Sequence, residues 1–153
     1  MEKLLDEDLV ALGLELPDWE TAVAHGSELL LRKGRVKEGY REKLIQREQE
    51  YPTGLQGKVM GIAVPHTSAD YTLQPAICVL IPSKPVPFRA MEDRETIVQA
   101  RLIFQLAITG GGMQLALLRR IMKLLRDDLL LCRLLQAQER GAVLALLRPV
   151  LEG

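Results

Sequence analysis

Three short, mainly apolar runs predict the buried strands of this chain. They cover Val59 to Val64, Ala76 to Ile81 and Arg101 to Ile108, lengths that suit strands better than helices. A fourth segment, Val86 to Arg89, contains a proline, which cannot donate a ladder hydrogen bond and therefore indicates an edge strand. Residues Glu92 to Gln99 fit neither pattern and are interpreted as a turn that leads into the last strand.

Apolar residues at helical spacing predict the helices. Asp18 is a suitable N-cap for a first helix that closes at Lys33–Gly34. Residues 1–16 are rich in leucine and acids, and are interpreted as a short helix or strand against the body of the protein. Tyr51 to Gly54 is interpreted as a turn. The other predicted helices cover Val36 to Glu50, Met113 to Arg126, Asp127 to Leu135 and Gly141 to Leu151.

The order of these elements predicts the fold class. A helix pair, then strands, then further helices indicate an α/β (α+β) sandwich, with a mixed sheet flanked by helices. At 153 residues the chain has the size of one domain, so residues 1–153 are predicted to form a single domain. A domain of this size buries roughly 68–70% of its unfolded surface, which is enough to fold without metals or disulfides.

Composition narrows the classes of function. Lys plus Arg and Asp plus Glu number 20 each, and the resulting formal net charge of zero argues against a nucleic-acid-binding protein. No apolar run approaches the ~18 residues that span a bilayer, and the acidic N-terminus lacks a signal-peptide layout. We therefore expect a cytoplasmic protein without direct membrane insertion. Cys78 and Cys132 are predicted to be buried thiols, and no metal-ligand spacing is present.

His66 is the main candidate for chemistry. It follows the strand that Pro65 ends, so a rigid backbone presents it at the margin of the sheet. Imidazole is largely neutral and nucleophilic near pH 7, and we expect an accessible ring. Taken alone, a histidine after a proline fits a structural role equally well. The other histidine, His25, is interpreted as a surface or half-buried residue of the first helix.

Other polar features carry weaker signals. Gly110–Gly112 precedes a helix and could wrap a phosphate, although a tight strand-to-helix connection explains the run equally well. Glu48 and Glu50 are predicted to lie on the surface. No Ser-His-Asp or Cys-His set, Walker loop or dinucleotide fingerprint can be assembled. A basic cluster on the next helix is interpreted as a solvated face: Arg119, Arg120, Lys123 and Arg126.

Motifs that are loose alone become specific when they are read in order. They are Tyr40 through Leu44 to Arg47-Glu48, then Thr53-Gly54-Leu55, then Gly61-Ile62-Ala63-Val64-Pro65-His66-Thr67. Together they resemble the enzyme IIA domain of the bacterial sugar phosphotransferase system, of the fructose–mannitol type. The later run Pro85 to Met91, followed by Val98 to Ile108, is similar to the galactitol-type branch. The resemblance covers roughly residues 4 to 150.

This resemblance implies a phosphocarrier with a five-stranded mixed sheet. His66 matches the histidine that accepts a phosphoryl group from the phosphocarrier protein HPr. That histidine passes the group to a cysteine of the IIB unit, which energises sugar uptake through the membrane IIC unit. Arg47 matches an arginine close to the active histidine. Thr53, Pro65 and Thr67 lie in the same motifs and are expected to contribute to binding, and the family implies no cofactor or metal.

Phosphoryl transfer depends mainly on positioning and charge stabilisation. One nitrogen of a neutral imidazole would attack, while the other is held as a hydrogen-bonded N–H that fixes the tautomer. A backbone carbonyl in the loop Thr67 to Asp70 is the expected partner of that N–H. Arg47 would place a planar, permanent charge near the phosphoryl group or orient the loop.

The chain departs from the mannitol-type pattern at one place. Mannitol-type members carry a second histidine near the start of the helix after the last strand, whereas Gly110 to Leu115 contains none. Thr109 or Gln114 could supply a neutral hydrogen bond instead, or the role could be absent. The departure favours the galactitol-like interpretation and leaves the transfer itself intact, since one nucleophile is enough.

Two alternatives stay open on the sequence. The domain could be a regulatory module in which phosphorylated His66 changes partner binding. It could also be a non-catalytic adaptor in which His66 is a buried, hydrogen-bonded core residue. The transported sugar is not determined by these residues, since the membrane unit binds it. The oligomeric state is left open as well.

Overall fold

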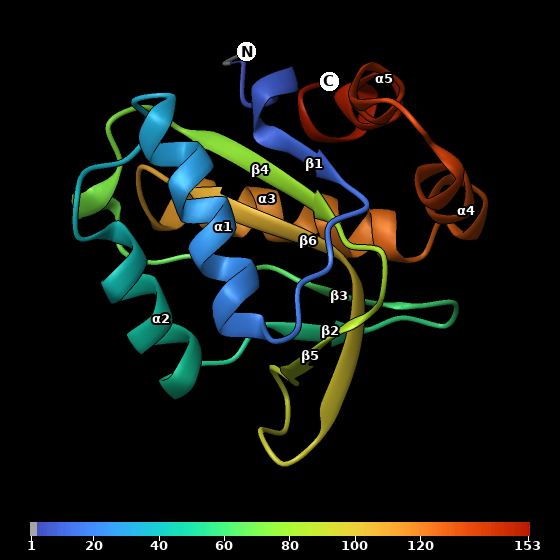
Figure 1. Cartoon of the computed structure of the whole chain (residues 1–153), viewed down its shortest axis with the longest axis horizontal. Helices are drawn as coiled ribbons and strands as arrows, with labels where there is room; N and C mark the ends of the chain where they lie inside the picture. Colours follow the sequence, from blue (N-terminus) through green and yellow to red (C-terminus); the bar gives the residue numbers. More distant parts are fainter. Residues whose placement is uncertain (1–2) are drawn as a thin grey trace.

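A computed structural model describes residues 3–153 and places them around one mixed β-sheet (Figure 1). The strand order is β1-β4-β6-β3-β2, and β5 also pairs with β6. Within the described residues the sheet has six strands, namely β1 (Val10–Leu12), β2 (Gly54–Gln56), β3 (Gly61–Ala63), β4 (Ala76–Ile81), β5 (Val86–Arg89) and β6 (Ile97–Ala107).

Strand β6 is the centre of the sheet. Ala100 pairs with both β3 and β5, and Ile103 pairs with both β3 and β4. Because a strand has two edges, β3 takes one edge of β6, and β4 and β5 share the other. The β3–β6 and β1–β4 pairs are parallel, and the remaining three pairs are antiparallel.

Helices cover both faces of the sheet, with α1 crossing in front of it and α3 behind it in Figure 1. Tyr40 and Leu44 belong to a core cluster on one face, and Ile121 and Leu147 belong to a second cluster on the other. Neighbouring strand residues such as Ile103 and Phe104 enter opposite clusters, so β6 is buried on both sides. The helices are α1 (Trp19–Arg32), α2 (Tyr40–Glu50), α3 (Gly111–Leu125), α4 (Asp128–Gln136) and α5 (Arg140–Leu151).

The predicted α/β class with a mixed sheet flanked by helices is confirmed, and within the described residues the sheet has six strands where about five were expected. Strands β4 and β5 have the predicted bounds. The additional short strand β2 begins at Gly54, where a turn was predicted to end, and pairs with β3. Near the N-terminus, where a short helix or a strand was expected, a 3-10 turn at Glu7–Leu9 is followed by strand β1.

Two strands differ in length from the prediction. Strand β3 is shorter, because Val59 is 44% exposed in a tight turn closed by the hydrogen bond from Gly57 N to Met60 O at 2.9 Å. Strand β6 is longer and begins at Ile97 rather than Arg101. Its first residues alternate between exposed and buried, which is the pattern of a strand with one face in solvent.

The helices begin and end close to the predicted residues, with one exception. Asp18 caps α1 as predicted and accepts a hydrogen bond from Thr21 N at 2.7 Å. Helix α2 was predicted from Val36 but begins at Tyr40. Gly39 has φ 93°, a left-handed conformation that interrupts a helix and favours glycine. Val36 instead forms an isolated bridge with Thr72.

The prediction that both cysteines are buried is correct for Cys78 and wrong for Cys132, which is exposed. Helix α4 packs against α3 and α5 and buries Leu131 and Leu134, and Cys132 lies outside this stripe. No helix among residues 3–153 has the length and apolar character needed to cross a membrane.

Candidate active site

The loop that carries His66 is fixed to the sheet through backbone hydrogen bonds. Val64 N donates to Thr53 O at 3.3 Å and to Thr53 Oγ1 at 3.2 Å. On the other side, Leu106 N donates to Pro65 O at 2.9 Å. Because Pro65 has a fixed φ and is bonded to β6, and Val64 is bonded to Thr53, the position of the His66 backbone is well defined.

The imidazole of His66 has two different nitrogens. Nδ1 lies 2.8 Å from Val64 O. A carbonyl oxygen only accepts hydrogen bonds, so Nδ1 carries the proton in this arrangement and Nε2 carries the lone pair of the neutral ring. The expectation of a partner carbonyl is confirmed, but its predicted place in the loop Thr67 to Asp70 is wrong, since the partner precedes His66.

His66 is 5% exposed, so the expectation of an accessible ring is wrong. Burial lowers the pKa of His66, the hydrogen bond to Val64 opposes this effect, and the positive charge of Arg47 lowers the pKa further. All else being equal, a lowered pKa keeps the ring neutral at physiological pH. The ring is therefore held in the protonation state that a nucleophile requires.

Arg47 lies on the last turn of α2, close enough to His66 for its charge to lower the pKa of the ring. Its guanidinium carbon is 5.3 Å from the centre of the Tyr51 ring, within the range of a cation–π contact. The side chain is partly buried, and its Nε has no hydrogen-bond partner among the described residues. Nε2 of His66 is likewise buried without a partner in that part of the chain.

These two atoms are complementary to a phosphoryl group. Buried polar atoms are normally hydrogen bonded, so two unpartnered ones in neighbouring residues require an explanation. Nε2 offers a lone pair that can bond to phosphorus, and the N–H of Arg47 offers a charged donor for a phosphoryl oxygen. The arrangement suits phosphoryl transfer.

Glu48 contradicts the prediction of a surface carboxylate, since it is 5% exposed. Its Oε2 accepts from Thr53 N at 2.8 Å, and its Oε1 accepts from Thr53 Oγ1 at 2.9 Å. Burial raises the pKa of Glu48 to about 7, although the two Thr53 bonds and the Arg47 charge act in the opposite direction. A helical signal for this burial exists in the sequence, because Tyr40, Leu44 and Glu48 are spaced by four residues and share one face of α2.

Comparison with known proteins now identifies the family. Residues 3–149 match the family described as the phosphoenolpyruvate-dependent sugar phosphotransferase system, EIIA 2. The galactitol-specific EIIA component of Escherichia coli is 33% identical over 110 residues, which are 72% of this chain and 73% of that protein. The chain belongs to the EIIA type 2 family. Within the family it lies near the galactitol-type branch.

Solved structures agree with this family fold. A chain of the complex of enzyme IIAMTL and phosphorylated enzyme IIBMTL from Escherichia coli is 26% identical, with a TM-score of 0.77 over 95% of this chain and 97% of that one. The nitrogen regulatory protein IIA-Ntr from Neisseria meningitidis is 22% identical, with a TM-score of 0.73 over 94% and 96% of the two chains. The latter similarity shows the fold alone.

The other predicted site residues of this EIIA domain differ in whether they lie in or beside the His66 loop. Thr53 is 3% exposed and Thr67 is 6% exposed, and both are joined to or adjacent to the His66 loop, as is buried Pro65. Thr109 is exposed and its hydroxyl bonds to Met113 Sδ at 3.4 Å. Within the described chain no hydrogen bond joins Thr109 or Gln114 to His66.

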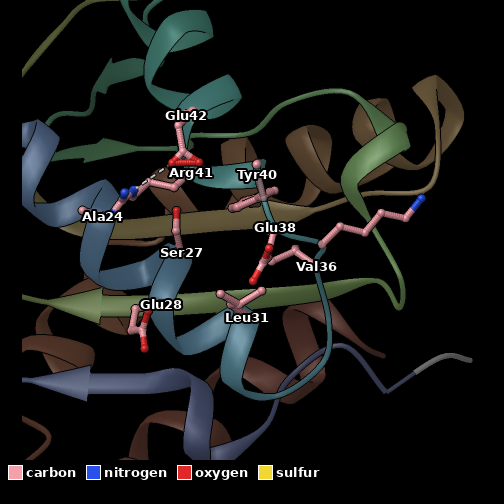
Figure 2. Close-up of a pocket in the computed structure, with 11 residues that line it drawn as sticks. Ala24, Ser27, Glu28, Leu31, Val36, Glu38, Tyr40, Arg41 and Glu42 are labelled. Atoms are coloured by element: carbon pink, nitrogen blue, oxygen red, sulfur yellow. Dashed lines mark hydrogen bonds and ion pairs between the residues drawn. The ribbon is translucent and has the colours of Figure 1, made fainter.

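A separate cleft of about 410 Å³ lies between α1 and α2 of the EIIA domain (Figure 2). Ser27 and Tyr40 are among its lining residues, and His66 is not. The hydroxyl of Tyr40 donates to Leu106 O at 2.8 Å, and Leu106 N in turn holds Pro65 O. Tyr40 therefore supports the His66 loop through β6, while the cleft itself stays separate from the site.

Proposed function

We propose that this EIIA protein accepts a phosphoryl group from phospho-HPr on Nε2 of His66 and passes it to a cysteine of a IIB component. The family establishes a phosphocarrier of the sugar phosphotransferase system in general terms. The assignment of the step to His66 rests on this chain's own geometry. Residues 1–153 would act as one domain in this relay.

The observation that carries the proposal is the pair of unpartnered buried atoms, His66 Nε2 and Arg47 Nε. A histidine with a purely structural role, as in the adaptor alternative, would be expected to bond through both nitrogens. Burial of the ring agrees with that alternative, but the unpartnered Nε2 does not. Phosphorylation would give both atoms a partner at once.

In the proposed step the phosphoryl group moves from an imidazole nitrogen of HPr to Nε2 of His66. The lone pair of His66 Nε2 forms a bond to phosphorus as the bond from phosphorus to the imidazole nitrogen of HPr breaks. The electron pair of the broken bond stays on the HPr nitrogen. The Nδ1 proton remains on His66, hydrogen bonded to Val64 O. Arg47 offsets the charge on the phosphoryl oxygens.

In-line attack also requires access to Nε2. Since His66 is 5% exposed and Nε2 is fully buried, the side chains over the ring must move when phospho-HPr docks. A barrier of this kind would also shield the phosphorylated ring from water between the two transfers.

The partners follow from the relatives. The similarity to a galactitol-specific EIIA component supports a galactitol-like sugar alcohol as the substrate of the pathway, with uptake through a membrane IIC unit. The related IIAMTL forms a complex with phosphorylated IIBMTL, which supports a IIB unit as the acceptor here. The regulatory alternative uses the same phosphorylated His66, and no contact in the site favours it.

Labelling by phospho-HPr tests the proposal. We expect the protein to acquire an acid-labile, alkali-stable phosphate that His66→Ala abolishes. His25→Ala is the matched control, because His25 lies half-buried on α1 and should leave labelling unchanged. The labelled protein should then transfer its phosphate to a galactitol-type IIB component. Full labelling of His66→Ala would refute the assignment.

A further inference from the structure

Glu48 is the buried charged group that the proposed transfer does not use. Its side chain is buried on the same face of α2 as those of Tyr40 and Leu44. A carboxylate in such a place is costly unless it is hydrogen bonded, and both of its oxygens bond to Thr53. A buried acid with a perturbed pKa next to a reactive residue is typical of functional sites.

A continuous series of hydrogen bonds leads from Glu48 to His66. Thr53 Oγ1 donates to Glu48 Oε1 at 2.9 Å and accepts from Val64 N at 3.2 Å. Val64 O then accepts from His66 Nδ1 at 2.8 Å. When Glu48 is ionised, the direction of each bond is determined, because the amide of Val64 can only donate and the Thr53 hydroxyl gives its one proton to the carboxylate.

Positive groups are the charged neighbours of Glu48. Arg47 on the same helix favours the ionised carboxylate. A small cavity of about 230 Å³ is lined by Glu48 together with Gln49 on α2, Trp19 on α1 and Arg89 on β5. Thr53, which directly precedes β2, contributes two donors. An ionised Glu48 is therefore a pure acceptor that both Thr53 donors can use.

We propose that Glu48 is a positioning residue for phosphoryl transfer, which holds His66 in the tautomer with the proton on Nδ1 through Thr53 and Val64. This inference rests on the proposed function of His66. Without the carboxylate, the N–H and hydroxyl of Thr53 would be buried without an acceptor, and β2 would lose its attachment to α2. The Val64 carbonyl would then hold Nδ1–H less firmly, and the Nε2–H tautomer, which has no lone pair for attack, would become populated.

Two substitutions separate this role from a general structural one. Glu48→Gln keeps the size of the side chain and removes its second acceptor oxygen and its charge. Thr53→Val keeps the volume and removes the hydroxyl, whereas Thr53→Ser restores it. Glu50→Gln is the matched control, because Glu50 lies two residues further along α2 and is exposed.

The first readout is the tautomer of His66, from ¹⁵N chemical shifts of the ring at pH 8. We expect the wild type, Thr53→Ser and Glu50→Gln to show one Nδ1–H tautomer, and Glu48→Gln and Thr53→Val to show a mixture. The second readout is single-turnover phosphorylation. We expect the maximal rate constant to fall about tenfold in Glu48→Gln and Thr53→Val, as for other residues that orient a functional histidine, while the half-saturating concentration of phospho-HPr stays within about twofold.

An unchanged tautomer and rate in folded Glu48→Gln and Thr53→Val would overturn the inference. If Glu48→Gln does not fold, Thr53→Val against Thr53→Ser decides the matter. The tautomer measurement requires no phosphoryl transfer, so it tests the positioning role directly. Retention of label by His66→Ala would instead refute the proposed function, and the two failures are thereby distinguished.

Discussion

At the scale of single residues, the site depends on the different surroundings of the two nitrogens of His66. Nδ1 is bonded to Val64 O, and Nε2 is left for chemistry. Burial and the charge of Arg47 disfavour protonation of the ring, which preserves the lone pair of Nε2. Val64 thus sets the tautomer of the nucleophile, and burial together with Arg47 keeps it neutral.

The first prediction concerns the titration of His66. Because its pKa is lowered by burial, and further by Arg47, the ring should titrate with a midpoint below ~6.5, the ordinary value for histidine. The phosphorylation rate should accordingly be constant above neutral pH as far as His66 is concerned, and fall in acid as the ring protonates. NMR titration, with the resonance assigned from His66→Ala, measures the midpoint. A midpoint above ~6.5 would contradict the described environment.

The second prediction concerns Arg47. Arg47→Lys keeps a positive charge but removes the planar group and its Nε donor, so phosphorylation should slow by at least about tenfold. Arg41→Lys is a matched control, since Arg41 is an exposed arginine six residues earlier on α2. Single-turnover labelling measures both rates. Equal rates for the two variants would show that the guanidinium of Arg47 does not contact the phosphoryl group.

Residue-level prediction from the sequence succeeded where backbone chemistry was decisive. Pro65 follows the end of β3 and fixes the backbone there, whereas the role of His66 as the nucleophile stays a prediction. Exposure was not predictable in this way, because the side chains that bury His66 come from elsewhere in the chain. Glu48 was placed on the surface because it is charged, and the two Thr53 donors that allow its burial are contacts between segments.

At the scale of elements, β3 lies unusually close to β6. A Cβ at Gly61 would lie 2.6 Å from Gln99 O and closer still to the side chain of Val98. The pairing register also shifts between Gly61 and Ile62. Only a residue without a side chain allows this approach, which places the end of β3 and hence His66 against the centre of the sheet.

The third prediction is that Gly61→Ala destabilises the protein by about 1–3 kcal/mol, because neighbouring backbone must move to admit the methyl group. Gly141→Ala is the control, since nothing lies within 4 Å of a Cβ there and alanine favours a helix. Urea unfolding of the two variants measures the difference. Equal stability of Gly61→Ala and the wild type would show that β3 and β6 can separate freely.

The fourth prediction concerns the start of α1. Asp18→Ala removes the acceptor for Thr21 N and should cost about 1 kcal/mol, whereas Asp18→Asn should retain most of the cap. Hydrogen bonds from the backbone and from the side chain of Thr21 lower the pKa of Asp18, so the capping carboxylate is ionised at neutral pH. Thermal unfolding compares the variants. Similar losses for Ala and Asn would indicate that charge rather than hydrogen bonding stabilises this end of α1.

Element boundaries were predictable when a local signal marks them. Asp18 and Asp127 cap α1 and α4 with their side chains, and β4 is a wholly apolar run. Strand β2 has three residues and depends on pairing with β3, which no local pattern reveals. The first half of β6 was missed because its alternating pattern, with Ile97 exposed and Val98 buried, differs from the apolar run that follows.

At the scale of the whole molecule, two core clusters lie on opposite faces of one sheet, and Glu48 borders one of them. Its folded pKa of about 7 exceeds the ordinary value of 4.5, mainly because burial disfavours the charge. The folded state therefore binds a proton more tightly than the unfolded state does. Stability from this group is complete below pH 4.5 and is lost as the pH rises through about 7.

The fifth prediction follows from that sign. The free energy of unfolding of the wild type, relative to Glu48→Gln, should fall by on the order of 3 kcal/mol between pH 4.5 and 8. The lowered pKa of His66 acts with the opposite slope, so the comparison between variants is needed to isolate Glu48. Urea unfolding across this range gives the difference. A difference that stays constant or rises with pH would contradict the burial of an ionisable Glu48.

The central position of β6 has a consequence for biosynthesis. Strands β3, β4 and β5 all pair with β6, which is the last strand to be translated. While Ile97–Ala107 is still inside the ribosome, no strand pairing can connect the β2–β3 pair to the β1–β4 pair. The nascent chain thus has its histidine long before it has a site around it, and the competent phosphocarrier forms only once β6 emerges.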